Sequence, residues 1–300
     1  MEDTGGGRLP VHGLAATLKL PMIKQLFSSS FLQGEAVKGY DAAQVVVETH
    51  RRICAWLRAG VTLPQIDAQI AKILEELGAK SAFKGYKPFR DKPPFPSHAC
   101  LSVNECVVHG TAAYFPRALQ AGDVLKIDIG AKYRGFIGDV GWTYSIGEPT
   151  AEVRKLMDVS KESLQRGIKQ LVPGNRLEAF ARAVQTYVEN ENGLFLVRGL
   201  GGHGYGRELH GGPFVSNTLA EPGYDWADAT TKCKPGMFVA VEPMLAIGTG
   251  RTKPEKGTWP VFSADDSMTA HHEHDVLVTE DGNVVLSEGM DELCDVITRV

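Results

Sequence analysis

Two aspartates in a stretch with the pattern of a β-hairpin constrain this chain more than any other feature. Residues 124–140 contain two extended runs in which apolar and polar side chains alternate. A turn at residues 133–134 would place Asp128 directly opposite Asp139, where cross-strand Cβ atoms lie roughly 4.5–5.5 Å apart. Two carboxylates at that distance repel unless one is protonated or a cation lies between them. The hairpin therefore predicts a metal site. A solvated surface hairpin, or a register that separates the two acids, is the alternative.

The length and composition are those of an ordinary globular protein. Three hundred residues, 43% hydrophobic and 23% charged, suffice for one large α/β domain or two small ones. A formal net charge of -4 leaves no basic footprint for nucleic acid, and no apolar run approaches the roughly 20 residues of a membrane helix. The five cysteines form no CxxC pair and the chain opens with acidic residues. We therefore expect a reducing compartment, the cytoplasm, and no targeting peptide.

Helical and strand periodicities follow one another in an order that occurs twice, first helices and then strands. The predicted helices span residues 35–59, 62–77, 148–171 and 177–188. The predicted strands outside the hairpin span residues 99–103, 106–109, 194–198, 236–245, 258–262, 272–279 and 282–286. This order predicts an α/β fold built from two similar halves. Residues 1–34 show no clear period and are expected to be an extension of unknown role, so that residues 35–300 form a single catalytic domain.

A histidine surrounded by glycines follows the predicted strand at 194–198. Residues 199–204 match the G-x-G-x-x-G pattern, but the sequence after them is too broken for the helix that a dinucleotide site requires. Glycine instead allows the backbone to approach a ligand or a metal closely, which makes His203 a candidate ligand. The alternative is a flexible glycine loop in which His203 and His210 are incidental.

Two glutamates lie in or beside apolar runs later in the chain. Glu242 ends the run 237–241, which has the composition of a buried strand. An ionised carboxylate there is costly unless it is paired or metal-bound. Glu273 shares one face of a predicted strand with His271 and Asp275, and no second cysteine or histidine cluster completes a structural zinc site there. For both glutamates, the alternative is a carboxylate that reaches solvent at the end of a strand.

Together these candidates comprise four carboxylates and one imidazole. They are Asp128, Asp139, His203, Glu242 and Glu273. Oxygen donors with one nitrogen suit Mn, Fe(II), Co or Zn rather than a thiolate site. Four carboxylates carry too much charge for one divalent ion, but they suit two ions about 3.5–4 Å apart, which acidify bridging water and polarise a carbonyl. We therefore expect two divalent metal ions.

On these residues, the chain resembles the type I methionine aminopeptidases, which have the pita-bread fold. The resemblance extends over about residues 35–286. It rests on the runs IDIGAKYRGFIGD (Asp128, Asp139), GGHGYGRELH (His203), VEPM (Glu242) and HEHDVLVTEDG (Glu273). It implies an α/β (α+β) fold of two pseudo-symmetric halves with a curved antiparallel sheet and flanking helices. It also implies that Asp139 and Glu273 bridge the two ions, that Asp128 completes one, and that His203 and Glu242 complete the other.

The same resemblance assigns the chemistry and the substrate contacts. It implies that one ion takes the free N-terminal amine, that a metal-bound hydroxide attacks the first peptide carbonyl, and that Glu242 shuttles the proton. His109 would contact the substrate near the scissile amide, and His210 would stabilise the oxyanion. The alternative is that each histidine only satisfies a neighbouring backbone group. The resemblance also implies six residues that form the walls of the pocket for the methionine side chain. The alternative is that they are ordinary residues of the hydrophobic core. They are Phe83, Tyr86, Phe95, Cys100, Leu209 and Trp259.

Several departures from the family pattern lie around the pocket and beside one ligand. The loops 87–94 and 111–115 are longer than usual, which puts the Phe95 assignment in doubt. Glycines at 211–212 stand where two acids are common, and Asp275 stands where threonine is common. An extra carboxylate at Asp275 adds negative charge near the expected ligands and would bear on metal preference.

Two rival functions remain open from the sequence. An Xaa-Pro dipeptidase or aminopeptidase of the same fold would share the metal ligands, although the runs 206–210 and 270–274 resemble the methionine-specific branch. A non-catalytic binding protein on this fold would have lost ligands, whereas all five are present. The short stretch between His203 and Glu242 favours type I over type II. The partners implied are the N-termini of nascent polypeptides, with transient association with the ribosome, and a monomer is expected.

Overall fold

The computed structural model describes residues 30–88, 90, 92–254 and 256–299. The predicted extension, residues 1–34, lies outside this part of the chain except for its last five residues. Those five are helical, because helix α2 spans Ser30–Trp56. The division into an extension and a single domain otherwise stays a prediction.

The first half of the molecule places two helices before its strands, as predicted. Its elements are α2, α3 (Leu63–Glu76), β1 (Lys80–Ser81), β2 (Cys100–Val103), β3 (Cys106–Val108), β4 (Val124–Tyr133) and β5 (Phe136–Ile146). Helix α3 begins where the sequence predicts it, since Gln65 Oε1 accepts the backbone N–H of Thr62 at 2.9 Å and Pro64 fits the first turn.

The second half repeats the order of helices followed by strands. Its elements are α4 (Ala151–Ile168), α5 (Leu177–Gln185), the π-helical turn η1 (Thr186–Glu191), β6 (Phe195–Leu196), β7 (Gly201–Gly204), β8 (Gly211–Ser216), the 3₁₀ turn η2 (Ala227–Thr230), β9 (Phe238–Val241), β10 (Met244–Ala246), β11 (Thr252–Pro254), β12 (Val261–Ser263), β13 (Thr269–His271), β14 (His274–Val278), β15 (Asn283–Val285) and β16 (Val296–Ile297). Sequence periodicity missed the short strands β1, β7, β8, β11, β13 and β16, which are two to six residues long.

The strands of each half form the main part of one five-stranded sheet, and the first of these sheets also includes β16 from the second half. The first has the order β1-β4-β5-β16 with β2 paired to β4, and the second has the order β15-β14-β9-β7-β8. Two three-stranded sheets, β13-β10-β6 and β11-β12-β3, complete the described strands. Pairing is antiparallel except between β16 and β5, the one parallel pair among the described strands. The predicted antiparallel sheets are therefore confirmed, with this one parallel pair at an edge.

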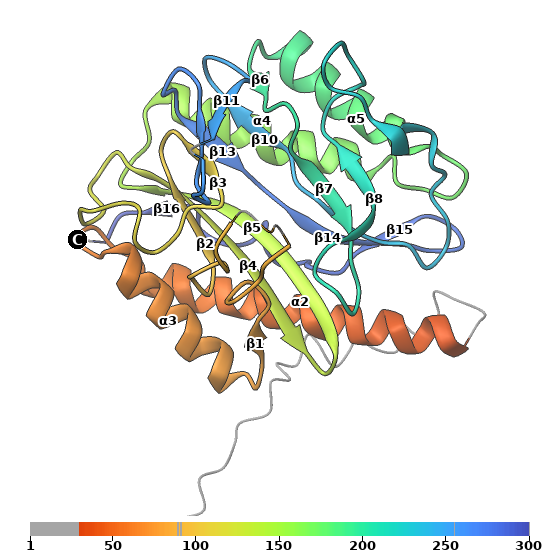
Figure 1. Cartoon of the computed structure of the whole chain (residues 1–300), viewed down its shortest axis with the longest axis horizontal. Coiled ribbons are helices and arrows are strands. Elements are labelled where there is room, and N and C mark those ends of the chain that lie inside the picture. Colours follow the sequence, from red (N-terminus) through yellow and green to blue (C-terminus); the bar gives the residue numbers. More distant parts are fainter. Residues whose placement is uncertain (1–29, 89, 91, 255, 300) are drawn as a thin grey trace, which may run out of the picture.

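Helices cover the strands from two sides, with α2 and α3 below the strands of Figure 1 and α4 and α5 above them. The first core joins α2 and α3 to β4 and β5 through residues such as Ile53, Leu63 and Ile127. The second core joins α4 and α5 to β9 and β14 through residues such as Phe180 and Val239. No helix in the described part of the chain is long and apolar enough to cross a membrane.

The hairpin β4–β5 forms in a register one residue away from the predicted turn. Tyr133 pairs with Phe136, so the turn residues are Arg134 and Gly135, both with positive φ (48° and 81°). A two-residue hairpin turn of this type requires positive φ at both positions, which glycine adopts without strain. The expected direct opposition of Asp128 and Asp139 is therefore wrong.

In the observed register each aspartate faces a glycine. Asp128 pairs with Gly141, and Asp139 pairs with Gly130. The two acids lie on the same face as diagonal neighbours, a position in which Cα atoms are roughly 7–8 Å apart. A Cβ at Gly130 would lie 2.5 Å from the Phe83 ring. The glycines thus leave room for other groups beside each carboxylate.

The glycine-rich run around His203 is a strand rather than a loop. Strand β7 lies inside the second sheet, where His203 pairs with Ala240 on one side and Phe214 on the other. The strands approach so closely that a Cβ at Gly202 would lie 2.1 Å from the carbonyl oxygen of Ala240. The alternative of a flexible loop around His203 is therefore wrong.

Candidate metal centre and substrate cavity

The five residues proposed as metal ligands from the sequence line a single cavity of about 440 Å³. Asp128 and Asp139 come from β4 and β5 in the first half. His203 comes from β7, and Glu242 and Glu273 come from breaks between strands in the second half. The cavity therefore lies where the two halves meet, and it brings together candidate ligands up to 145 positions apart in the chain, Asp128 and Glu273.

Glu242 and Glu273 face one another across an interrupted ladder. The predicted strand 236–245 breaks after Val241, because Pro243 has no N–H to continue the pairing. On the two sides of this break, β9 pairs with β14 and β10 pairs with β13 in one common register. Continuing that register through the gap places Glu242 opposite Glu273. Two carboxylates that face each other in this way repel unless one is protonated or a cation lies between them. The opposition expected for Asp128 and Asp139 is thus found for Glu242 and Glu273.

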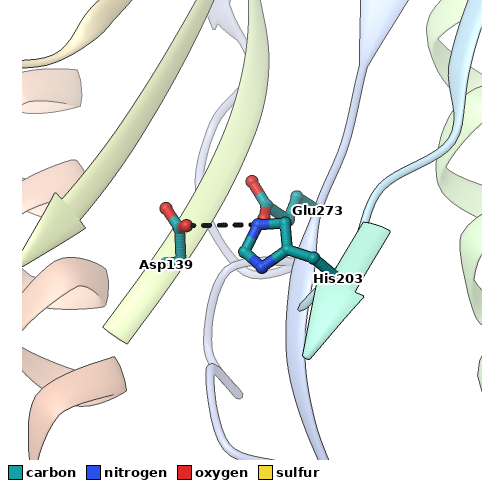
Figure 2. Close-up of side chains that lie close together, drawn as sticks. All are labelled: Asp139, His203 and Glu273. Carbon is teal, nitrogen blue, oxygen red and sulfur yellow. Dashed lines mark ion pairs between the residues drawn. The ribbon is translucent and has the colours of Figure 1, made fainter. Parts of the chain in front are cut away.

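His203 turns one ring nitrogen toward the acids. Its Nδ1 lies 3.2 Å from the carbonyl oxygen of Gly204, which favours the tautomer that donates from Nδ1. Its Nε2 lies 3.7 Å from Oδ2 of Asp139 and 3.9 Å from Oε1 of Glu242. Figure 2 shows the imidazole beside Asp139 and Glu273, with a dashed line from the ring to the Asp139 carboxylate. Nε2 is thereby left free to act as a metal ligand.

Backbone contacts hold two of the carboxylates in place. The N–H of Asp139 donates to Oδ2 of Asp275 at 2.9 Å, and the N–H of Glu273 donates to the carbonyl oxygen of Gly141 at 2.8 Å. A Cβ at Gly141 would lie 3.1 Å from Oε2 of Glu273. The unusual Asp275 is therefore an anchor for the backbone of Asp139, and it is fully buried.

Burial and mutual repulsion make this cluster electrostatically costly. Burial raises the pKa of Asp128, Asp139, Glu242 and Glu273 well above the usual range, and the neighbouring carboxylates raise it further. Burial lowers the pKa of His203 to about 3, with a further contribution from His210. The imidazole is therefore neutral and offers no positive charge to the acids. Divalent cations would supply it.

The unsatisfied atoms of the cluster fit a metal pair. Oδ1 of Asp128 and Oδ1 of Asp139 are buried without a hydrogen-bond partner, although buried carboxylate oxygens normally have one. Donor atoms of Asp139, His203 and Glu273 lie within 4.8 Å of one another. Carboxylates with a neutral imidazole are donors that Mn, Fe(II), Co and Zn accept. These residues therefore suit the ions expected from the sequence.

His109 and His210 border the same cavity. His109 has a positive φ of 58°, an uncommon conformation outside glycine, and its ring lies edge-on to Trp259 with centroids 6.1 Å apart. Burial lowers the pKa of His109 to about 4, with Lys92 and His210 adding to the effect. Nδ1 of His210 lies 2.6 Å from the hydroxyl of Tyr86, and burial lowers the pKa of His210. Both rings are therefore neutral near pH 7.

The predicted pocket walls form one apolar cluster beside the carboxylates. Phe83, Phe95, Cys100, Leu209 and Trp259 are buried together, with Tyr86 packed against them, and all six line the cavity. The Phe95 ring meets that of Phe83 at 6.1 Å and that of Trp259 at 5.2 Å, edge to face in both cases. Despite the long loop before it, Phe95 therefore lies in the wall. None of residues 111–115 lines the cavity in the described part of the chain.

Further residues line the cavity that sequence reasoning did not assign to it. They include Pro88, Val108, Leu200, Phe214 and Met244. Their apolar side chains carry no chemical signal in a sequence, so only their positions in space identify them. His271, which the sequence pattern places on the same strand face as Glu273, is not among the residues that line the cavity. Its Nε2 lies 3.2 Å from Oε2 of Glu242.

Comparison with known proteins agrees with this geometry. A model of metallopeptidase family M24 matches residues 40–280. This chain belongs to metallopeptidase family M24. The M24 relatives include methionine aminopeptidase 1 of Bacillus subtilis, which is 36% identical over 247 residues, covering 82% of this chain and 94% of the relative. The sequence-based identification of the family is confirmed.

Solved structures of M24 proteins place the chain on the same fold. The methionine aminopeptidase of Thermotoga maritima superposes with a TM-score of 0.75 at 33% identity, covering 83% of this chain and 95% of that one. The prolidase of Pyrococcus furiosus superposes with a TM-score of 0.66 at 21% identity, covering 89% of this chain and 67% of that one. The prolidase likeness is one of fold alone. The predicted pita-bread architecture of mixed helices and sheets is confirmed.

Proposed function

We propose that this chain removes the N-terminal methionine from peptides and nascent proteins by metal-dependent hydrolysis. One arrangement carries the proposal: a single cavity joins an apolar cluster of side-chain size to four carboxylates and an imidazole. Relatives named methionine aminopeptidase, 35–36% identical over 82–86% of the chain, support it.

The two ends of the cavity recognise different parts of a substrate. The walls Phe83, Phe95 and Trp259 would bury the methionine side chain, a burial worth about 1.5–3 kcal/mol. The carboxylate end attracts the positively charged N-terminal amine. Because that amine and the side chain must fit together, the first peptide bond is placed beside the acids and internal bonds are excluded.

The protein groups around the scissile bond have distinct proposed roles. Asp128, Asp139, His203, Glu242 and Glu273 would hold two divalent ions, Co, Mn, Fe or Zn. When bound, such ions acidify water and polarise a carbonyl. Glu242, with a pKa raised by burial and by Asp139, would accept a proton from the attacking water and deliver it to the leaving amine.

Neutral imidazoles border the pocket on two sides. His210 is oriented by Tyr86, and its other nitrogen can donate to the oxygen that becomes negative in the tetrahedral intermediate. His109, beside Trp259, would hold the substrate near the scissile amide. Neither role requires a charged ring.

We expect His210→Ala to lower kcat by roughly 10²–10³, the usual cost of removing one oxyanion donor, with a smaller change in KM. The measurement is steady-state release of methionine from Met-Ala-Ser. Tyr86→Phe serves as the matched control, because it keeps the imidazole and removes only its orienting hydroxyl, so its loss of kcat should be smaller. Turnover of His210→Ala close to that of the unchanged protein would remove the proposed role.

We expect Cys100→Leu to reduce use of methionine substrates by narrowing the pocket. Cys100 is buried in the wall, and burial, followed by Asp128, raises the pKa of its thiol, so the group stays neutral. A misfit of even one methylene in such a pocket changes kcat/KM by roughly 10–200-fold, and leucine exceeds cysteine by more than one methylene. Release from Met-Ala-Ser should fall by that order and release from Ala-Ala-Ser by much less. The control is Cys233→Leu, a buried cysteine in the other core. Equal losses for both substrates would contradict the assignment.

One assay separates this proposal from its rivals. Release from Met-Ala-Ser, Leu-Ala-Ser and Ala-Pro is measured with Mn, Co, Fe and Zn in turn. Methionine-selective release supports the proposal. Proline-selective cleavage favours an Xaa-Pro peptidase, and the absence of turnover and of bound metal favours a binding protein.

We further propose that the protein works in the cytoplasm as a monomer on N-termini of nascent chains, in transient contact with the ribosome. The support for a reducing compartment is that all five cysteines are free. The family resemblance supports the choice of partners.

A further inference from the structure

A second imidazole lies beside the carboxylate cluster, and one of its ring nitrogens makes no hydrogen bond. His271 is the last residue of β13 and is 1% exposed. Its Nε2 is buried without a hydrogen bond, yet lies 3.2 Å from Oε2 of Glu242 and 3.9 Å from Oε2 of Glu273. A buried polar atom of this kind normally has a hydrogen-bond partner. This nitrogen faces the carboxylates and has none, which is expected of an atom that binds a metal ion.

The backbone fixes His271 in this position. Its N–H donates to Oγ1 of Thr143 at 2.9 Å, and the same hydroxyl donates to the carbonyl oxygen of His271 at 2.6 Å. Gly141 makes room for the ring, since a Cβ there would lie 2.9 Å from Cε1 of His271. The Thr143 hydroxyl therefore fixes the backbone of His271, and the space at Gly141 lets the imidazole reach the acids.

The separations suit donors that share one ion. Two ligand atoms with metal bonds of about 2.0–2.2 Å at right angles lie roughly 3 Å apart, close to the 3.2 Å between His271 and Glu242. Donor atoms of Glu242, His271 and Glu273 all lie within 4.8 Å of one another. His203 approaches the other oxygen of Glu242, Oε1, at 3.9 Å. The two imidazoles thus flank the same carboxylate.

We propose that His271 is a sixth protein ligand of the metal pair, donating Nε2 to the ion that Glu242 and His203 hold. The site then has two imidazoles rather than one. This inference rests on the metal pair of the proposed function and is independent of the choice of substrate. Because imidazole suits Co, Zn and Fe better than Mn, His271 shifts the preference of the site toward those ions.

The number of imidazole ligands can be counted directly. In the cobalt-loaded protein, each imidazole bound to the ion gives a strongly shifted, exchangeable N–H resonance in the proton NMR spectrum, which disappears in D₂O. We expect two such resonances in the unchanged protein and one in His271→Gln. His272→Gln is the matched control, because His272 is equally buried and its Nε2 also lacks a hydrogen bond, but its Nδ1 lies 2.9 Å from Oγ of Ser160 and its ring lies edge-on to Trp142 rather than among the carboxylates. That variant should keep both resonances.

Calorimetric titration gives a second measure. His271→Gln should bind Co and Zn at least about 10-fold more weakly at one of the two sites, while His272→Gln should not. One shifted resonance in the unchanged protein would overturn the sixth ligand and leave the proposed function standing. No shifted resonance, with no metal bound, would overturn both. Since the count in the unchanged protein already distinguishes one imidazole from two, the test stands even if a variant fails to fold.

Discussion

Asp139→Asn is expected to abolish methionine release and to lose bound metal. Its kcat should fall by more than the roughly 10²–10³-fold that removal of one oxyanion donor causes. Asp139 is 2% exposed, its Oδ1 has no protein partner, and its carboxylate is proposed to bridge both ions. The amide keeps the shape but not the charge, so the site cannot balance two divalent cations. Metal content per chain and kcat/KM on Met-Ala-Ser are the measurements.

A stability measurement distinguishes this loss from simple unfolding. Without metal, Asp139→Asn removes one of several repelling buried charges, so the variant should melt at a higher temperature than the unchanged protein. With metal present, the order should reverse. Asp123→Asn is the control, because Asp123 is also buried but pairs with Arg117 at 2.7 Å outside the cavity. It should lose stability while keeping activity per folded molecule. Full activity in Asp139→Asn would contradict the bridging role.

Metal removal is expected to abolish activity and to destabilise the protein, and the destabilisation should be larger at pH 8 than at pH 6. The pKa values of the four carboxyls are raised in the metal-free fold, by burial first. In the unfolded chain they ionise near pH 4. Between that pH and the raised values, the folded state binds more protons, so the free energy of unfolding of the metal-free protein falls as pH rises.

Metal ions compete with those protons, so their stabilising effect grows with pH. At ion concentrations of about 100 times the dissociation constant, each site adds about 2.7 kcal/mol to the free energy of unfolding. The measurement is Tm at pH 6, 7 and 8 with chelator and with Co or Mn. Asp139→Asn, which has lost one carboxylate, should show a smaller dependence on pH. A metal-induced shift in Tm that stays constant or shrinks as pH rises would contradict this account.

The sequence predicts the convergence of the candidate ligands better than it predicts local geometry. The long helices, the hairpin and the convergence of five donors follow from periodicity and from the cost of burying unpaired acids. The register of β4 and β5 does not, because one residue of difference in the turn leaves the alternation of Ile127 and Ile129 unchanged. Only the positive φ that Gly135 supplies decides where the chain reverses.

Long-range contacts account for most of the other differences. Three of the four residues of β7 are glycines, so the strand shows no alternation of apolar and polar side chains. It forms because Gly202 fits against Ala240. The predicted strand 236–245 missed the break at Pro243, although proline has no N–H to continue the pairing. The partner break before His274 depends on pairing between β10 and β13. The position of His271 likewise depends on the contact of β13 with Thr143 in the other half.

The division of the donors between the two halves has a consequence for how the protein becomes active. The first half supplies only Asp128 and Asp139, and the second supplies the imidazoles and glutamates. Neither fragment alone offers a full coordination sphere. Cation binding therefore requires both halves to be folded, and a chain truncated before β13 would lack Glu273 and remain inactive however well its earlier residues had folded.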